Sequence, residues 1–268
     1  MAFHLVEKDG LSWLESDILG VKHMFTRKLG GVGDFPYSSG PDPVWEAPEV
    51  QERVRSLWLR FRQAGGFPQE GFCFTRQVHG TVIRPVTAAE RKLPPLLRRP
   101  EDCDGLVTTE RDVPLCIFTA DCVPVLLSDP EHGVVCAVHS GWKGTVADSM
   151  GAAVRSMTER GACIGSIRAA IGPAISRCCF ETGPEVKEAV EALLGPDARG
   201  LCPPEEGVPG KYMVDLKEAN RRRLLQLGLA ESQVDVSAEC TMCRSDVYWS
   251  HRATKGRRGT QAAVIQLG

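Results

Sequence analysis

The sequence lacks the features of several large protein classes. No apolar run approaches the roughly 18–20 residues of a transmembrane helix, and the N-terminal stretch MAFHLVEKDGLSWLESD carries charges where a signal peptide needs an apolar core. The formal net charge is only −2, with acidic and basic residues mixed along the chain. Binding to nucleic acid or to a membrane surface through charge is therefore not indicated. We expect a cytoplasmic, monomeric protein whose partner is a small molecule.

Common cofactor and oxidase signatures are also missing. There is no Walker A motif, and the glycines at 30–33 do not form G-x-G-x-x-G after a strand, so no nucleotide cofactor is indicated. The H-x-E motif of zinc nucleobase deaminases is absent, because Gly80 and Thr81 follow His79. None of the six histidines forms a His-x-His pair, which argues against a histidine-rich copper cluster.

Cysteines are plentiful, but their spacing does not suggest a disulfide framework. The count of eleven is odd, and several lie in apolar, strand-like runs, which is typical of reduced, buried thiols. Cys240-x-x-Cys243 stands alone as a motif. A structural zinc site would need a second spaced pair, whereas Cys178 and Cys179 are adjacent. We interpret Cys240 and Cys243 as buried thiols at the end of a strand.

Alternating strand and helix patterns predict an α/β fold with a mixed sheet, in a single domain over residues 1–268. Helices are expected over 47–66, over 145–161, after a capping box from Thr182 to Glu185, and after an N-cap at Asp215. The segment 71–86 is expected to form a pair of strands with Gln77 and His79 on one face. The charged, proline-containing segment 87–104 is expected to be an exposed loop.

The stretch from Asp121 to Thr145 carries the strongest indication of chemistry. Cys122 begins one apolar run, His139 ends the next, and the turn-rich SDPEHG lies between them. In such a hairpin the two side chains would lie close together. A thiolate beside an imidazole is either a nucleophile with its base or part of a metal site. His79 would add a third metal ligand, and Asp121 could orient a ligand, move a proton, or simply form a turn.

Basic residues near glycines are candidates for binding phosphate. Arg27 and Lys28 precede a glycine-rich loop, and Lys143 lies in SGWKGT, which leads into a predicted helix whose first N–H groups would face an anion. Gln77, on the same predicted face as His79, is a further candidate for contact with substrate.

Four motifs in order resemble the YfiH-like family, whose members have been called laccase-domain or multicopper polyphenol oxidases and zinc-dependent purine nucleoside phosphorylases. They are QVHG at 77–80, ADCVPVLL at 120–127, VHSGWKGT at 138–145, and IGPAIS followed by CCFE within 171–181. The resemblance implies that His79, Cys122 and His139 bind Zn²⁺, or else copper. It also implies a layered α/β/β/α sandwich with mixed sheets, similar to the catalytic domain of cytotoxic necrotising factor toxins.

The resemblance implies three kinds of activity. The first is zinc-dependent phosphorolysis of adenosine, inosine and methylthioadenosine, together with adenosine deamination. The second is a Cys–His hydrolase or amidase that removes a wrongly incorporated serine from a muramoyl peptidoglycan precursor. The third is copper-dependent oxidation of phenols. The chain departs from the family pattern in its loop at 26–42 and at Lys143, where an arginine is usual. Since lysine lacks the arginine fork, these departures bear on phosphate binding and substrate choice.

Overall fold

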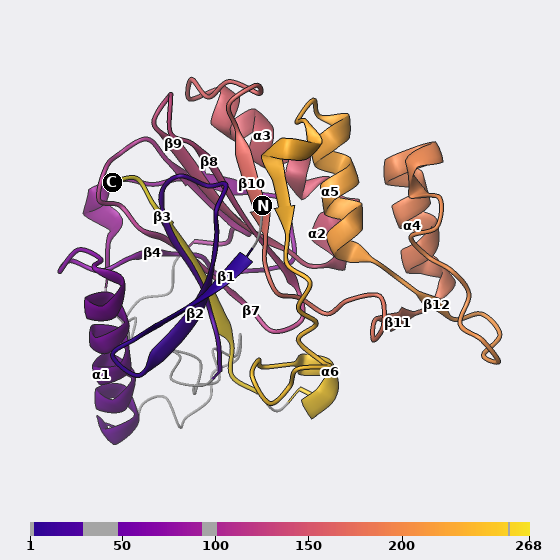
Figure 1. Ribbon diagram of the computed structural model, residues 1–268, viewed down its shortest axis with the longest axis horizontal. Coiled ribbons are helices and arrows are strands. Elements are labelled where there is room, and N and C mark those ends of the chain that lie inside the picture. Colours follow the sequence, from indigo (N-terminus) through magenta and orange to yellow (C-terminus); the bar gives the residue numbers. More distant parts are fainter. Residues whose placement is uncertain (1–2, 29–47, 93–100, 257) are drawn as a thin grey trace.

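The computed structural model describes residues 3–28, 48–92, 101–256 and 258–268. Two six-stranded mixed sheets lie face to face, with helices on their outer sides (Figure 1). The glycine-rich stretch at 30–33 lies outside the described residues.

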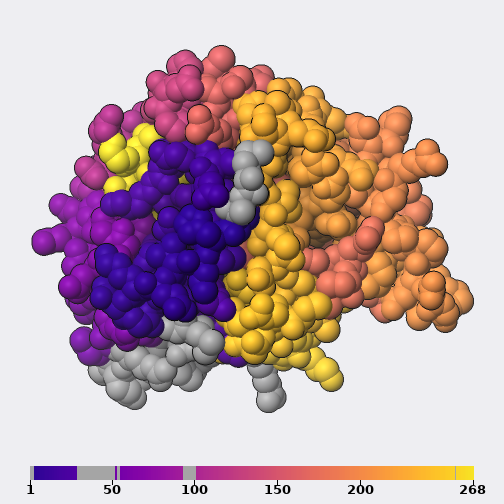
Figure 2. All heavy atoms as spheres, viewed as in Figure 1, coloured from indigo at the N-terminus to yellow at the C-terminus, as the bar shows by residue number. Residues whose placement is uncertain are grey.

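The first sheet joins the two ends of the chain. Its C-terminal strand pairs on one side with an N-terminal strand, which places segments from the beginning and the end of the sequence next to each other (Figure 2). All neighbours in this sheet are antiparallel except the last pair, β4 and β7. The strand order is β1 (Phe3–Lys8), β2 (Leu11–Ser16), β3 (Lys22–Thr26), β14 (Gln261–Gln266), β7 (Leu115–Thr119) and β4 (Cys73–Phe74).

The second sheet has the expected hairpin at its centre. β8 (Val123–Asp129) and β9 (Val134–Ser140) are antiparallel and buried along their whole length. The strand order is β13 (Val234–Val236), β10 (Arg168–Ile171), β8, β9, β6 (Gly105–Thr108) and β5 (Ile83–Pro85). A separate small pair consists of β11 (Glu181–Thr182) and β12 (Tyr212–Met213).

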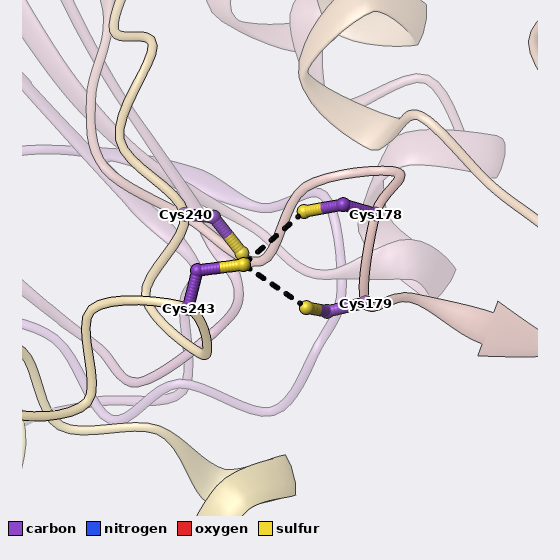
Figure 3. Close-up of side chains that lie close together, drawn as sticks. All are labelled: Cys178, Cys179, Cys240 and Cys243. Atoms are coloured by element: carbon purple, nitrogen blue, oxygen red, sulfur yellow. Dashed lines mark hydrogen bonds between the residues drawn. The ribbon is translucent and has the colours of Figure 1, made fainter.

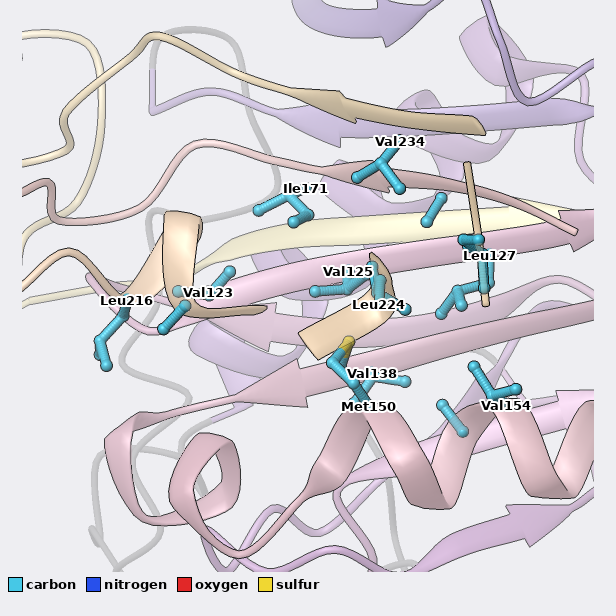
Figure 4. Close-up of a cluster of buried hydrophobic side chains, with 14 of the residues drawn as sticks. Val123, Val125, Leu127, Val138, Met150, Val154, Ile171, Leu216, Leu224 and Val234 are labelled. Carbon is cyan, nitrogen blue, oxygen red and sulfur yellow. The ribbon is translucent and has the colours of Figure 1, made fainter. Parts of the chain in front are cut away.

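Buried side chains form three layers between these elements. Aromatic residues fill the space between α1 (Pro48–Gly65) and the first sheet, where Trp58 packs edge-on against Phe72, Phe74 and Phe118. The space between the two sheets is filled mainly by small and aliphatic side chains, together with Phe25. The outer face of the second sheet is covered by α3 (Ser149–Thr158) and α5 (Leu216–Gln226) (Figure 4), and α4 (Pro184–Leu194) packs beside α5.

This layering explains why the hairpin strands are almost continuously apolar. Side chains alternate between the faces of a strand. In β8, Val125 and Leu127 pack toward the helices, whereas Leu126 packs into the layer between the sheets. Because both faces are covered, both sets of positions must be apolar. The predicted α/β class with mixed sheets is confirmed.

Three predicted elements differ from the structure. The helix expected over 145–161 is two helices, α2 (Trp142–Val146) and α3, because Asp148 has a left-handed φ of 69° and caps α3 by accepting from Gly151 N. Gly183, not Thr182, caps α4. The expected strand pair at 71–86 shrinks to β4 and β5, with no strand over 75–82. The predicted N-cap at Asp215 is confirmed, because its side chain accepts a hydrogen bond from Glu218 N at 3.0 Å.

The remaining short elements are η2 (Ala88–Glu90), η3 (Gly195–Ala198), η4 (Glu231–Gln233) and α6 (His251–Thr254). Within the described part of the chain, no helix combines the length and the apolar character needed to cross a membrane.

Truncating Leu126 should destabilise the fold, because this side chain is fully buried between the sheets. We expect Leu126→Ala to lower the free energy of unfolding by about 2–5 kcal/mol, as measured by urea denaturation. Leu5→Ala is the control, since Leu5 is 49% exposed on the edge strand β1. It should change stability by no more than about 0.5 kcal/mol. Equal losses in both variants would contradict the assigned layers.

Candidate metal centre

His79, Cys122 and His139, called the metal trio below, come together at one end of the second sheet. Their ligand atoms all lie within 4.8 Å of one another. Cys122 Sγ is 3.9 Å from His79 Nε2, and the two imidazole rings meet edge-on with centroids 4.9 Å apart. His139 is buried, whereas His79 is exposed and Cys122 partly exposed, so the trio opens toward solvent.

The hairpin brings two members of the trio together. Pro124 in β8 lies opposite His139 in β9, and Cys122 immediately precedes β8. The expected neighbourhood of Cys122 and His139 is therefore a direct consequence of the hairpin register.

The third member is positioned by a buried carboxylate. Asp104 accepts hydrogen bonds from the backbone N–H groups of Val78 (3.1 Å), His79 (2.9 Å) and Gly80 (2.7 Å). Successive N–H groups converge on one anion where right- and left-handed residues follow each other, and His79 has φ 62°. Such a conformation costs about 1–3 kcal/mol in a non-glycine residue. The segment is a loop wrapped around Asp104, and the expected strand is wrong for this reason.

Asp104 also orients His139. Its Oδ1 lies 2.8 Å from His139 Nδ1, and its backbone carbonyl accepts from His139 N at 2.7 Å. A proton held on Nδ1 leaves Nε2 as the free ligand atom. Sequence reasoning missed Asp104 because it was assigned to an exposed loop, whereas the side chain is fully buried. One feature of the sequence could have indicated a buried Asp104: it is followed by Gly105, which begins an apolar run.

Electrostatics favour a charged cysteine in the trio. Burial opposes the thiolate, but His139 and His79 outweigh it and lower the pKa of Cys122 to about 6. Burial also opposes the imidazolium, but the Cys122 thiolate and Asp104 raise the pKa of His139 to about 9. At a pH between these two pKa values, and without a bound metal ion, the two residues form a thiolate–imidazolium pair. Such a pair is competent either as a nucleophile with its base or, once His139 loses its proton, as metal ligands.

The geometry of the trio fits a metal ion. Around tetrahedral zinc, a thiolate sulfur and an imidazole nitrogen lie about 3.5 Å apart, from their usual bond lengths. The 3.9 Å between Cys122 and His79 is close to this. A side chain at Gly141 would place its Cβ 2.8 Å from the His79 ring and 3.2 Å from Cys122 Sγ. Glycine at this position thus leaves room for the ligands. With three protein ligands, a fourth position stays open for substrate or water.

A buried polar network anchors the chain after His139. Ser140 Oγ lies within hydrogen-bonding distance of Thr145, Ser149 and Asn220, at 2.8–2.9 Å. Asn220 Nδ2 in turn donates to Thr145 Oγ1 and to the Leu216 carbonyl. The network links β9 to α2, α3 and α5, which holds the His139 end of the hairpin in place.

Asp121 lies next to the trio but its carboxylate is directed elsewhere. Oδ1 accepts from Thr241 Oγ1 at 2.6 Å and Oδ2 accepts from Arg252 N at 2.7 Å. These contacts tie the start of β8 to the C-terminal part of the chain. Orientation of a metal ligand, one role expected for Asp121, belongs instead to Asp104.

The expected substrate-binding residues have different surroundings. Gln77 exchanges two hydrogen bonds with the Phe118 backbone, so it holds the loop that carries His79. Arg27 donates to Ser12 Oγ, and Lys28 Nζ donates to the Ser245 carbonyl while it lies over the Trp249 ring. Lys143 is exposed, in the five-residue helix α2.

One further cation lies beside the trio. Arg258 is partly buried, which lowers its pKa, and the charges of Cys122 and Asp121 act on it in the opposite sense. Its guanidinium donates to His251 Nδ1 at 3.3 Å and to the Gly259 carbonyl at 3.2 Å. The sequence shows this residue only as part of a basic turn, because its electrostatic interaction with Cys122 joins positions far apart in the chain.

Comparisons with known proteins agree with this geometry. A family model described as multi-copper polyphenol oxidoreductase laccase matches residues 22–268. The purine nucleoside phosphorylase YlmD of Geobacillus stearothermophilus is 33% identical, over 97% of this chain and 96% of that protein. A purine nucleoside phosphorylase of Bacteroides thetaiotaomicron is also 33% identical, over 94% and 92%. The adenosine deaminase RL5, from an unknown prokaryotic organism, is 37% identical over 57% of each chain.

Solved structures show the same fold. The crystal structure of YlmD from Geobacillus stearothermophilus superposes with a TM-score of 0.84 at 31% identity, over 98% of both chains. The Bacillus licheniformis hypothetical protein YfiH gives a TM-score of 0.84 at 27% identity, over 99% of both. Sequence and fold together show that the chain belongs to the YfiH-like family of laccase-domain proteins, whose members include enzymes named purine nucleoside phosphorylases.

Proposed function

We propose that this protein is a zinc-dependent purine nucleoside phosphorylase that acts on adenosine, inosine and methylthioadenosine and also deaminates adenosine. The observation that carries the proposal is the convergence of His79, Cys122 and His139, with His139 oriented by Asp104. Relatives named purine nucleoside phosphorylase, which match nearly the whole chain, support the first activity. The shorter match to an adenosine deaminase supports the second.

The metal trio would hold the zinc ion. Bound zinc would supply a Lewis acid and lower the pKa of a bound water toward about 7. Asp104 keeps the Nδ1 proton of His139 in place, so that Nε2 faces the ligand position. The lowered pKa of Cys122 favours its thiolate form at neutral pH, which suits it as a zinc ligand.

Phosphorolysis also needs cations for the phosphate. In this reaction a phosphate oxygen bonds to C1′ of the ribose as the glycosidic bond breaks and the purine leaves with a proton. Arg258, which interacts electrostatically with Cys122 and Asp121, is a proposed phosphate ligand. Lys143, Arg27 and Lys28 remain proposed phosphate ligands, and Gln77 a proposed substrate contact.

Removing the thiol should abolish both metal binding and turnover. Cys122→Ala takes away one of three protein ligands, so bound zinc and the phosphorolysis of adenosine and inosine should both fall to background. Metal content and release of free base measure the two effects. Cys163→Ser is the matched control, because Cys163 is an exposed cysteine outside the trio. Full activity in a metal-free Cys122→Ala protein would refute the proposal.

Asp104→Asn tests the orientation of His139. The amide keeps the size of the side chain but loses the charge that holds the Nδ1 proton and the three N–H groups. We expect zinc affinity or kcat/KM to fall by about 10–100-fold. Asp102→Asn is the control, since Asp102 is an exposed partner of Arg76 two residues away. Equal effects of the two substitutions, with circular dichroism unchanged, would contradict the assigned role.

A metal-free cysteine hydrolase or amidase is the second candidate, favoured by the thiolate–imidazolium pair. Cys122 would attack a carbonyl carbon, and His139 would return a proton to the leaving amine. A serine-containing muramoyl peptidoglycan precursor is the proposed substrate of this kind. The likeness to cytotoxic necrotising factor toxins, which use a Cys–His pair, stays a prediction.

Alkylation against pH separates the two candidates. After chelation, iodoacetamide should label Cys122 with a midpoint near pH 6, because the reactive thiolate forms above the lowered pKa and is lost below it. His139→Ala removes the imidazolium and should move the midpoint upward. Zinc bound to the thiolate should suppress labelling. Labelling that chelators and zinc leave unchanged, with turnover of an amide substrate, would favour the hydrolase.

Copper-dependent phenol oxidation has less support from the ligands. The trio includes two of the six histidines, whereas multicopper sites use many. The others bond elsewhere: His4 with Asp17, His23 with Ser16 and Val21, His132 with Asp129, and His251 with Arg258. Metal analysis after reconstitution distinguishes zinc from a single copper ion on the same trio.

A further inference from the structure

Four cysteines outside the metal trio converge on one point. The sulfur atoms of Cys178, Cys179, Cys240 and Cys243 all lie within 4.8 Å of one another, and we call these residues the four-cysteine cluster. Their side chains point toward each other from two separate segments (Figure 3). Although Cys178 and Cys179 lack the spacing expected of a second zinc pair, the fold brings them to the Cys240-x-x-Cys243 motif. Both adjacent cysteines lie in one tight turn, closed by bonds from Cys179 N and Phe180 N to the Ser176 carbonyl.

The distances within the cluster suit one metal ion. Cys243 Sγ is 3.5 Å from Cys178 Sγ and 3.3 Å from Cys179 Sγ. A disulfide would need about 2.05 Å, whereas the sulfur atoms around a tetrahedral zinc ion stand about 3.8 Å apart, from the usual bond length. Sulfurs that ligate a cluster of several iron atoms stand further apart than those around a single ion. The arrangement therefore matches a mononuclear site.

Backbone groups are already aimed at one sulfur. Ser176 N donates to Cys240 Sγ at 3.4 Å, and the backbone groups of Cys243 and Met242 act with it to lower the pKa of Cys240 against the effect of burial. Such N–H···S bonds stabilise the charged thiolate that binds a metal and fix its direction. The turn is thus organised around the sulfur as an acceptor, which a set of inert buried thiols does not require.

A buried lysine supports the same turn. Lys217 is only 5% exposed, and its ammonium group donates to the carbonyls of Ser237 (2.6 Å) and Glu239 (3.0 Å). These bonds hold the chain just before Cys240. The positive charge also acts on Cys240 and Cys178, so it offsets the negative charge of a tetrathiolate site.

We propose that the four-cysteine cluster is a second metal site, which binds one divalent ion in tetrahedral thiolate coordination, with zinc as its natural occupant. Four sulfur ligands and no open position are typical of structural zinc. Cys178 and Cys243 are exposed, and a surface groove lined in part by Ser176, Arg177 and Cys178 gives the ion a route to the sulfurs.

The site would brace the metal trio from outside. Thr241, within the Cys240-x-x-Cys243 turn, donates to the Asp121 carboxylate, while Ile175 N donates to the Asp121 carbonyl at 2.9 Å. Thr241 N also bonds to the Ala174 carbonyl at 3.1 Å. Both segments that carry the cysteines therefore hold the residue before Cys122. A metal ion that joins them would fix this end of the hairpin.

Metal stoichiometry tests the second site without reference to activity. After saturation with zinc and removal of loosely bound metal, the native protein should retain about two zinc ions per chain. Cys122→Ala should retain about one, Cys178→Ser with Cys243→Ser about one, and all three substitutions together none. The exposed-cysteine control Cys163→Ser should match the native protein. A native count near one, unchanged by the two serines, would overturn the proposal.

Thiol labelling of the unmodified protein tests the site even if the serine variants fail to fold. The exposed Cys178 and Cys243 should resist N-ethylmaleimide until a chelator is added, whereas exposed Cys163 should react at once. A spectroscopic test uses the variant Cys122→Ala, which keeps all four cysteines of the cluster: cobalt substituted in it should give the intense thiolate charge-transfer bands of a four-sulfur site. Rapid labelling of Cys178 and Cys243 before chelation, or their recovery as a disulfide by mass spectrometry, would refute the site. Neither result bears on whether the trio catalyses phosphorolysis.

Discussion

The buried carboxylate of Asp104 makes the hydrogen bonds that position both histidines of the metal trio. A charged group removed from water is tolerated only when hydrogen bonds replace its lost hydration. Three backbone N–H groups and the His139 imidazole provide those bonds. They also hold the pKa of Asp104 below its usual range despite burial, which would raise it. The same bonds force His79 into left-handed backbone and fix the tautomer of His139, so one anion positions two ligands.

The hairpin supplies the third ligand and the rigidity of the site. β8 and β9 lie at the centre of the second sheet, covered by helices on one face and by the first sheet on the other. Because both faces are closely packed, a shift of the strands by one residue would move every side chain to the opposite face and disrupt the packing against both neighbouring layers. Cys122 and His139 are consequently held at one end of a rigid layer, while exposed His79 leaves the position open to substrate.

The C-terminal segment connects this site to the four-cysteine cluster. The Asp121 carboxylate accepts hydrogen bonds from Thr241 Oγ1 and Arg252 N, and the Asp121 carbonyl accepts one from Ile175 N. Arg258, further along the same segment, acts electrostatically on Cys122. The residues around the trio thus come from widely separated parts of the chain. The family comparison is consistent with this, since it extends from residue 22 to residue 268 rather than over the motifs alone.

The sequence by itself determined the features that arise from local periodicity and turns. The turn-rich SDPEHG and its flanking apolar runs were enough to pair Cys122 with His139, and the N-cap at Asp215 followed from short-range spacing. Family motifs, not spacing, placed His79 with them.

Only the tertiary structure decided the rest. Asp104 looked like part of a charged loop, Asp121 looked like a catalytic candidate, and Cys178–Cys179 looked unable to join Cys240-x-x-Cys243. In each case the decisive partner lies far away in the sequence, at a distance that no periodicity encodes. Such contacts form when packed layers bring separate segments together. Whether a polar side chain is buried or solvated then depends on the hydrogen-bond partners that the fold brings to it.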